Sequence, residues 1–127
     1  MRYVYPVVLI EEEDGYYVRV PDFDSSTQSK DLAEAIEMAR DLIGIMAIDF
    51  EEDKKEIPKP NSVKFEKEKD SIITLVDVDF LEYRKKYNNK MIRKNLTIPY
   101  WLNVEAEKAG INFSQVLQVA LKEKLNV

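Results

Sequence analysis

Hydrophobic and polar residues in the first part of the chain follow the two-residue period of β-strands. Residues 3–10 and 16–20 are rich in β-branched and aromatic side chains, and Asp14-Gly15 between them is a turn signal, because glycine accepts positive φ. The pattern predicts a two-stranded hairpin. Pro6 lacks an N–H group, so it favours a sheet edge or a bulge for the first strand. A loop at residues 21–26 is expected to follow, and Thr27-Gln28 is interpreted as a short third strand.

The period changes at residue 31, where apolar residues begin to recur at spacings of three and four. This spacing defines one face of an α-helix, and Asp31 with Glu34 forms a capping box at its start. We predict a helix from about Leu32 to about Asp53. Its apolar stripe consists of Leu32, Ala35, Ile36, Ala39, Ile43, Met46 and Phe50. The acidic opposite face is typical of a solvated surface.

Pro58 and Pro60 end the regular pattern and indicate a connection within the same domain. Residues 63–66 are compatible with an edge strand. The near-continuous apolar run at residues 71–78 predicts a strand that is buried on both faces.

Asp79 and Glu82 form a second capping box, which predicts a short helix at residues 80–87. Asn88-Asn89-Lys90 ends this helix. We therefore predict a first domain at residues 1–88 and a second at residues 91–127.

The second domain begins with a strict alternation at residues 92–98. Because successive side chains of a strand point to opposite faces, Ile92, Leu96 and Ile98 share one face and Arg93, Asn95 and Thr97 share the other. On alternation alone, the polar face is better explained as the solvated side of an ordinary strand.

Two short helices are predicted after this strand. Pro99 suits the first turn of a helix, and Gly110 suits its end. Asn112 is a favourable N-cap for a second helix from Phe113 to about Asn126. One strand and two short helices bury too little apolar surface to fold alone, and the lone strand has unpaired edges. We predict a homodimer in which two strands pair into a ribbon, with a larger assembly left open.

Composition restricts the chemistry. The chain of 127 residues has no histidine and no cysteine, so it lacks the commonest general base, a thiol nucleophile and disulfides. The apolar runs are too short for a membrane span and the start lacks a signal-peptide pattern, so we expect a cytoplasmic protein without a membrane partner. Residues 1–90 carry 14 basic and 21 acidic side chains, whereas residues 91–127 carry 5 and 3. The two parts are expected to meet different partners.

The order of strand, proline, short helix, glycine and Asn-capped helix resembles a ribbon-helix-helix DNA-binding domain. In that family the outward residues of the ribbon read base edges in the major groove and the inward residues pack on the helices. Carried over by position, the resemblance implies that Arg93, Asn95 and Thr97 contact bases. It implies that Leu96 and Ile98 belong to the core.

The same resemblance implies phosphate contacts at the start of the second helix, through Asn112 and the backbone N–H groups of Phe113 and Ser114. Lys94 lies on the face assigned to the core, where the family more often has an apolar residue. We expect its side chain to extend to a phosphate instead.

The preceding residues resemble a HicB antitoxin. The resemblance is carried by the hairpin, the Pro-Asp loop, the long helix, the Ile57-Pro58-Lys59-Pro60 link and the strand ending at Asp79. Residues 83–99 are similar to the family's joint between its two parts, so the resemblance spans nearly the whole chain. It implies an α+β fold, with a partial ribonuclease H-like domain, whose antiparallel sheet packs on one long helix, followed by the ribbon-helix-helix.

This resemblance implies a toxin-antitoxin pair. The first domain would bind a HicA toxin, a small basic RNA-cleaving protein, and cover its active site, while the C-terminal dimer would bind operator double-stranded DNA and repress the shared operon. Independently, an acidic domain suits a partner whose surface holds RNA. We place the toxin contact at Asp22, Phe23, Asp24, Ser25 and Ser26, although many family members have a Pro-Gly-Cys type segment at residues 24–26.

Two alternatives remain open from the sequence. A ribonuclease H-like scaffold can hold divalent ions, and the pairs Asp22 with Asp24 and Asp77 with Asp79 have suitable spacing for a metal-dependent nuclease. We favour the interpretation of these residues as turn and cap residues, and hence no enzyme, catalytic residue, metal or cofactor. The other alternative is a stand-alone repressor whose first domain binds a small ligand or another copy of itself.

Overall fold

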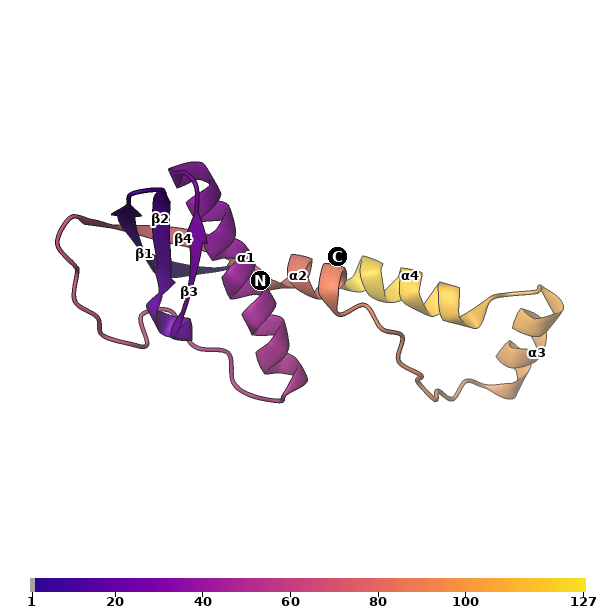
Figure 1. Ribbon diagram of the computed structural model, residues 1–127. Helices are drawn as coiled ribbons and strands as arrows, with labels where there is room; N and C mark the ends of the chain where they lie inside the picture. The colour runs from indigo at the N-terminus through magenta and orange to yellow at the C-terminus, as the bar shows by residue number, and fades with distance from the viewer. Residues whose placement is uncertain (1) are drawn as a thin grey trace. The chain divides into compact units, whose positions relative to one another are not determined.

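The computed structural model describes residues 2–127 and divides into two compact units, one ending at Lys90 and one formed by Met91–Val127 (Figure 1). Each unit is described by itself. The elements of the first unit are β1 (Arg2–Glu12), β2 (Gly15–Val20), the 3-10 turn η1 (Pro21–Phe23), β3 (Ser25–Ser29), α1 (Leu32–Glu52), β4 (Ser71–Asp79) and α2 (Phe80–Tyr87). The elements of the second unit are α3 (Tyr100–Lys108) and α4 (Phe113–Leu125).

The first unit is a four-stranded antiparallel sheet in the order β3-β2-β1-β4, with α1 packed on one face (Figure 1). Side chains from every second position of the strands meet α1 in one core, as the strand period requires. The core residues are Tyr5, Val7, Leu9, Val18, Val20, Phe23, Ala35, Ala39, Ile43, Ala47, Val76, Val78 and Phe80. The expected α+β class with one long helix on an antiparallel sheet is therefore confirmed.

The predicted hairpin is confirmed, with Glu12 paired to Gly15 across the turn. Gly15 has φ +146°, and a Cβ atom there would lie 2.1 Å from the carbonyl oxygen of Ser29, so the position requires glycine. The predicted third strand at Thr27-Gln28 is also confirmed and is longer than expected, since β3 includes Ser25 and Ser26 of the predicted loop.

The expectation for Pro6 was wrong. β1 lies inside the sheet between β2 and β4, and its pairing with β4 runs without a bulge from Arg2 to Ile10. The pairing of β1 with β2 begins only at Val8. Pro6 is tolerated because it lies before the β2 ladder, where no β2 residue needs its missing N–H group.

Two expectations about the second half of this unit were also wrong. β4 is an edge strand rather than one buried on both faces, and Ile72, Ile73 and Leu75 are exposed. Residues 63–66 form no strand, and the Val63 N–H donates to the Asp22 carboxylate instead of to a neighbouring strand. Apolar runs report burial poorly when a strand lies at an edge.

The long helix is confirmed at Leu32–Glu52, where the Asp31 carboxylate accepts a hydrogen bond from the Glu34 N–H (2.8 Å). Leu32 is 44% exposed, so the buried stripe begins at Ala35. The short helix α2 is confirmed and is capped by Asp79, whose carboxylate accepts from the Leu81 N–H (3.0 Å).

Helix α2 packs closely on α1. A Cβ atom at Gly44 would lie 2.5 Å from the Tyr83 ring, so the absence of a side chain lets the ring approach the helix backbone. The Tyr83 hydroxyl donates to Asp41 (2.7 Å), and the Arg84 Nε donates to both carboxylate oxygens of Glu51 (2.8 and 2.9 Å). These contacts belong to the first unit and bring its last helix against its longest one.

The second unit contains the two predicted helices but not the predicted strand. Residues 88–99 form neither helix nor strand. A β-strand is stabilised by hydrogen bonds to a neighbour, and nothing within the unit offers one. None of the helices among residues 2–127 is long and apolar enough to cross a membrane.

Candidate functional site

The turn between α3 and α4 is fixed by backbone hydrogen bonds. Gly110 has φ +68°, its N–H donates to the Glu107 carbonyl, and the Ile111 N–H donates to the Ala106 carbonyl, each at 3.0 Å. This is the glycine-terminated helix end that the sequence predicts. It sets α4 to begin only a few residues after α3 ends.

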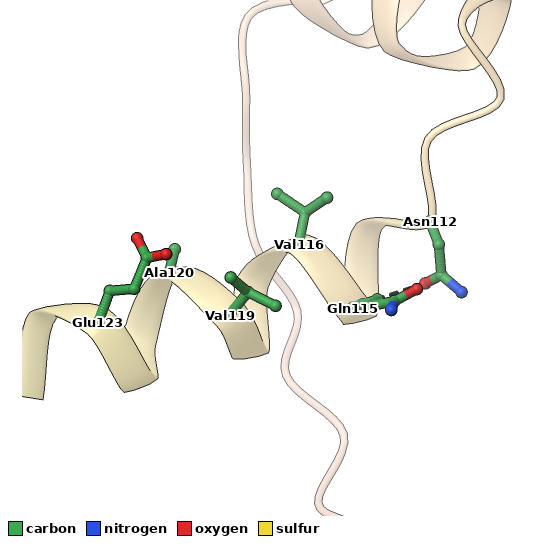
Figure 2. Close-up of a pocket in the computed structure, with 6 residues that line it drawn as sticks. All are labelled: Asn112, Gln115, Val116, Val119, Ala120 and Glu123. Carbon is green, nitrogen blue, oxygen red and sulfur yellow. Dashed lines mark hydrogen bonds between the residues drawn. The ribbon is translucent and has the colours of Figure 1, made fainter. Parts of the chain in front are cut away.

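Helix α4 begins as predicted. The side-chain oxygen of Asn112 accepts a hydrogen bond from the Gln115 N–H (3.1 Å), which makes Asn112 the N-cap (Figure 2). The N–H groups of Phe113 and Ser114 lie in the first turn, where a helix offers no internal acceptor. Both residues are exposed, so this helix start is open to an anion.

The residues predicted to read DNA bases precede α3. Arg93, Asn95 and Thr97 are exposed, as is Lys94. The residues predicted for the core are exposed as well. The exposed fractions are 75% for Ile92, 66% for Leu96 and 45% for Ile98. Within one chain, therefore, nothing distinguishes a polar face from an apolar face of this segment.

The two helices also expose their apolar faces, and neither contains a buried residue. Val116, Val119 and Ala120 line a shallow groove along α4 between Asn112 and Glu123 (Figure 2). Further large apolar residues with exposed side chains are Tyr100, Trp101, Leu102, Ile111, Phe113, Leu121 and Leu125. Exposure of this many large apolar side chains on a unit of this size is typical of an interaction surface.

The loop predicted to bind the toxin is partly interior. Asp22 and Phe23 are 5% and 4% exposed, whereas Asp24 and Ser26 are exposed and Ser25 is half-buried. Asp24 adopts a left-handed backbone with φ 46°, and its N–H donates to the Pro21 carbonyl (3.0 Å). Of the five residues predicted for this contact, only those at 24–26 are accessible from solvent.

The Asp22 carboxylate ties the connection between α1 and β4 to the sheet. It accepts hydrogen bonds from the N–H of Asn61 (3.1 Å), the N–H and hydroxyl of Ser62 (2.6 and 2.8 Å) and the N–H of Val63 (3.3 Å). This role was missed from the sequence, because the partners lie about forty residues away and carry no local signal.

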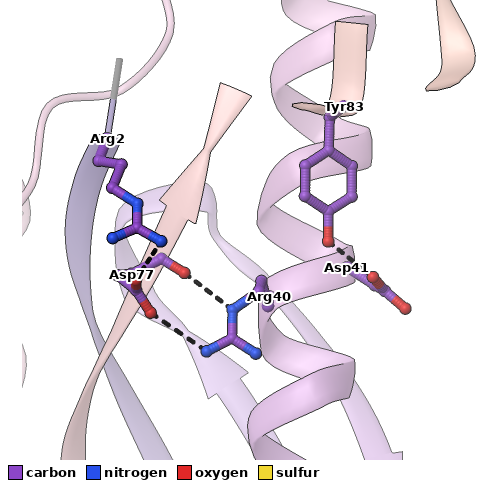
Figure 3. Close-up of polar contacts among 5 residues, drawn as sticks. All are labelled: Arg2, Arg40, Asp41, Asp77 and Tyr83. Atoms are coloured by element: carbon purple, nitrogen blue, oxygen red, sulfur yellow. Dashed lines mark hydrogen bonds and ion pairs between the residues drawn. The ribbon is translucent and has the colours of Figure 1, made fainter. Parts of the chain in front are cut away.

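The Asp77 carboxylate lies between two arginines (Figure 3). Arg40 reaches it from α1 at 3.2 Å and Arg2 from β1 at 3.6 Å. The hydrogen bond from Arg40 lowers the pKa of this carboxyl below its usual range, helped by the positive charge of both arginines and opposed by partial desolvation. The role of Arg40 as a partner was missed from the sequence, because the two residues lie 37 positions apart.

Three of the aspartates considered as metal ligands are engaged in hydrogen bonds within the protein. Asp22 and Asp77 accept hydrogen bonds from protein donors, and Asp79 caps α2. Among residues 2–127, no group of three or more histidine, cysteine, aspartate or glutamate side chains could hold a metal ion.

Comparisons with known proteins converge on one family. The profile of a family described as "HicB_like antitoxin of bacterial toxin-antitoxin system" matches residues 5–118. A protein of Haemophilus phage HP1, described as an uncharacterized 14.9 kDa protein in the rep-hol intergenic region, is 33% identical over 101 residues, which cover 76% of this chain and 73% of that protein.

Two solved structures are similar. A chain of a toxin-antitoxin complex from Streptococcus pneumoniae is 32% identical, with a TM-score of 0.59 and coverage of 98% of this chain and 99% of that chain. The antitoxin HicB of Burkholderia pseudomallei is 19% identical, with a TM-score of 0.49 and coverage of 96% and 98%.

Proposed function

Since this chain belongs to the HicB-like antitoxins of bacterial toxin-antitoxin systems, we propose that it neutralises a HicA-type mRNA-cleaving toxin and, as a homodimer, represses its own operon. The first unit covers the active site of the toxin. The second unit binds operator DNA. One observation carries the homodimer on which the DNA-binding part depends: the unit Met91–Val127 has two helices with no buried residue, so a second copy is proposed to complete its core.

Pairing of two copies accounts for the absent strand. The segment at residues 92–98 has no neighbour in one chain, and a second copy running antiparallel supplies one. The resulting ribbon presents Arg93, Asn95 and Thr97 outward and covers Leu96 and Ile98 with the helices. A two-stranded ribbon fits the major groove of B-DNA.

Each outward residue type suits a base edge. Arginine donates two hydrogen bonds to guanine, asparagine pairs with adenine in two places, and threonine offers a hydroxyl and a methyl group. Asn112, Phe113 and Ser114 at the start of α4 receive a phosphate, because the first-turn N–H groups and the helix dipole favour an anion. Lys94 adds a further phosphate contact.

The toxin-binding role of the first unit rests on charge and on the family. Residues 1–90 carry seven more acidic than basic side chains, which complements a basic RNA-binding protein. The similar Streptococcus pneumoniae chain comes from a toxin-antitoxin complex. In this proposal Asp24, Ser25 and Ser26, which are exposed or half-buried, contact the toxin directly, and the buried Asp22 and Phe23 support the loop from within.

DNA recognition is tested by titrating labelled DNA from upstream of the operon. Arg93→Ala is expected to weaken specific binding by about 1–3 kcal/mol and to relax the preference for one base pair. Lys108→Ala is the matched control, because it removes the same charge from an exposed position on α3 that lies outside the proposed contacts. Operator binding that survives simultaneous alanine replacement of Arg93, Asn95 and Thr97 would show that the ribbon does not read the bases.

Toxin neutralisation is tested by co-expression of the chain with the small basic protein encoded beside it. We expect the two proteins to co-purify and RNA cleavage to be suppressed. Failure to bind while operator binding persists would favour the stand-alone repressor.

A further inference from the structure

Strand β4 lies at an edge of the sheet, and the register shows which of its backbone groups face outward. The hairpin closes with the pair Glu12 and Gly15, so even-numbered residues of β1 bond to β2 and odd-numbered residues bond to β4. Through the pairing of Leu9 with Ile72, the even-numbered residues of β4 bond to β1. The N–H and C=O groups of the odd-numbered residues of β4 therefore point to the free edge.

Two hydrogen bonds agree with this assignment and close the ends of the edge. The Ser71 N–H donates to the Glu68 carbonyl (3.1 Å), and the Asp77 carbonyl accepts from the Arg40 Nε (2.9 Å), beside the ion pair shown in Figure 3. Between these ends, Ile73 and Leu75 offer their outward N–H and C=O groups with no neighbouring strand.

The side chains of the same two residues are exposed and apolar. Ile73 is 44% and Leu75 is 66% exposed, and their pairing with Val8 and Pro6 places both on the sheet face opposite α1. An edge that combines open backbone groups with exposed apolar side chains is a template for an added strand.

We propose that this edge pairs antiparallel with β4 of a second copy about a twofold axis at Thr74, which joins the two sheets into one of eight strands. In this register, Ile73 lies opposite Leu75 of the second copy, and the reverse contact follows by symmetry. Each pair exchanges two backbone hydrogen bonds and buries two apolar side chains against each other. The interface is independent of the function proposed above.

A second copy fits this edge because the two backbone groups of β4 that already have partners lie opposite each other in this register. The register places Ser71 opposite Asp77 of the second copy. The Ser71 N–H and the Asp77 carbonyl, which would otherwise bond to each other, already have Glu68 and Arg40 as partners. The Asp77 N–H remains for the Ser71 carbonyl. A strand of unrelated sequence would place a carbonyl opposite the Ser71 N–H and an N–H opposite the Asp77 carbonyl. Both groups of that strand would lack a hydrogen-bond partner.

The charges are compatible with self-pairing. The acidic residues of β4, Asp77 and Asp79, lie at its end, so the antiparallel register keeps those of the two copies apart. The register brings the two aspartates of one copy opposite Ser71 and the turn that holds Lys69 in the other copy. Together with a C-terminal ribbon, this second twofold contact builds assemblies larger than a dimer.

Single cysteines test the register, because the chain contains no cysteine of its own. Thr74→Cys places two thiols across the axis in a non-hydrogen-bonded pair, with Cα atoms about 4.5 Å apart, within disulfide range. We expect a reducible cross-linked dimer of the full-length protein under mild oxidation. Ile72→Cys is the matched control on the same strand, because its two copies lie about 13 Å apart along the strands.

Leu75→Lys tests the contact without a cross-link. It is expected to abolish the cross-link of Thr74→Cys and to lower the assembly mass measured by light scattering, while circular dichroism stays unchanged. Val63→Lys, a similar change at an exposed apolar residue of the connection, should leave both readouts as in the parent protein.

Three outcomes would overturn the proposal. They are equal cross-linking of the two cysteine variants, no cross-link with Thr74→Cys, and an unchanged assembly mass with Leu75→Lys. If Leu75→Lys instead removes toxin co-purification at constant assembly mass, the edge belongs to the toxin. The operator titration with Arg93→Ala is read separately, so failure of this edge contact is distinguishable from failure of the DNA-binding proposal.

Discussion

The two units differ in how completely a single chain buries their apolar side chains. In the first unit, Tyr5, Leu9, Ile43 and Phe80 are at most 2% exposed within a single chain. In the second, α3 and α4 have no buried residue and Trp101 is 67% exposed. The first unit therefore completes its core within one chain and the second does not, so under the proposed homodimer the order of the second unit would depend on protein concentration.

The two units also differ in net charge, which is negative in the first and positive in the second. The acidic first unit suits a basic protein partner, and the mildly basic second unit suits DNA. Under the proposed function, the unit that binds DNA is also the unit that lacks a core within one chain. The following changes test this contrast, beginning with the largest expected effect.

Phe80→Ala should destabilise the core of the first unit. The Phe80 ring is 1% exposed and packs on Tyr3 and Tyr5 with centroid distances of 5.2 and 6.3 Å. Its removal leaves a cavity, so we expect a loss of about 3–5 kcal/mol in the free energy of unfolding. Urea unfolding followed by circular dichroism measures the loss, with parent and variant compared at the same protein concentration. Ile45→Ala, at an exposed position of α1, is the control and should change stability little.

Asp22→Ala should release the connection from the sheet. It removes the acceptor for Asn61, Ser62 and Val63 and leaves their donors without this partner, so we expect a cost of about 2 kcal/mol. Limited proteolysis should then cut residues 54–70 faster than in the parent protein. Asp24→Asn, which removes the neighbouring exposed charge and suits the left-handed backbone at this position, should leave the cleavage rate unchanged. Equal rates in both variants would contradict the structural role of Asp22.

Val116→Lys should weaken association of the second unit without affecting the first. Val116 is 53% exposed in one chain and lines the groove on α4, where a charge would have to be buried on dimerisation. We expect the dimer dissociation constant to rise at least about tenfold, or about 1.4 kcal/mol. The chain has a single tryptophan, Trp101, so its fluorescence on dilution reports this unit alone. An unchanged dilution curve would indicate that α4 lies outside the dimer interface.

Asp77→Asn should have the smallest effect on stability. The effect is recognised by its dependence on pH. The pKa of this carboxyl is lowered in the folded chain by Arg40, so its contribution to stability is present above the ordinary carboxyl pKa of about 4 and is lost as the pH falls through the lower folded value. The group is exposed, so the contribution is small. Thermal unfolding should separate the variant from the parent at pH 7, and the difference should vanish near pH 2. A difference that persists at low pH would point to a cause other than charge.

Local signals in the sequence predicted most of the elements. The turn at Asp14-Gly15, the caps at Asp31, Asp79 and Asn112, and the glycine at position 110 all act through neighbouring backbone groups, and the structure places them as predicted. The expectations that were wrong concern neighbours across the sheet: Pro6 lies inside it, β4 lies at its edge, and residues 63–66 form no strand. The roles of Asp22 and Arg40 were missed for the same reason, because their partners are distant in the chain.

The sequence by itself determined the periods of its helices and strands, the caps that begin its helices, and the charge contrast between its two parts, since each depends on residues a few positions apart or on their sum. Only the tertiary structure decided which strand stays at the edge and which carboxylates are occupied by donors from distant residues. These depend on which segments meet in space, and the spacing of residues along the chain does not contain that information.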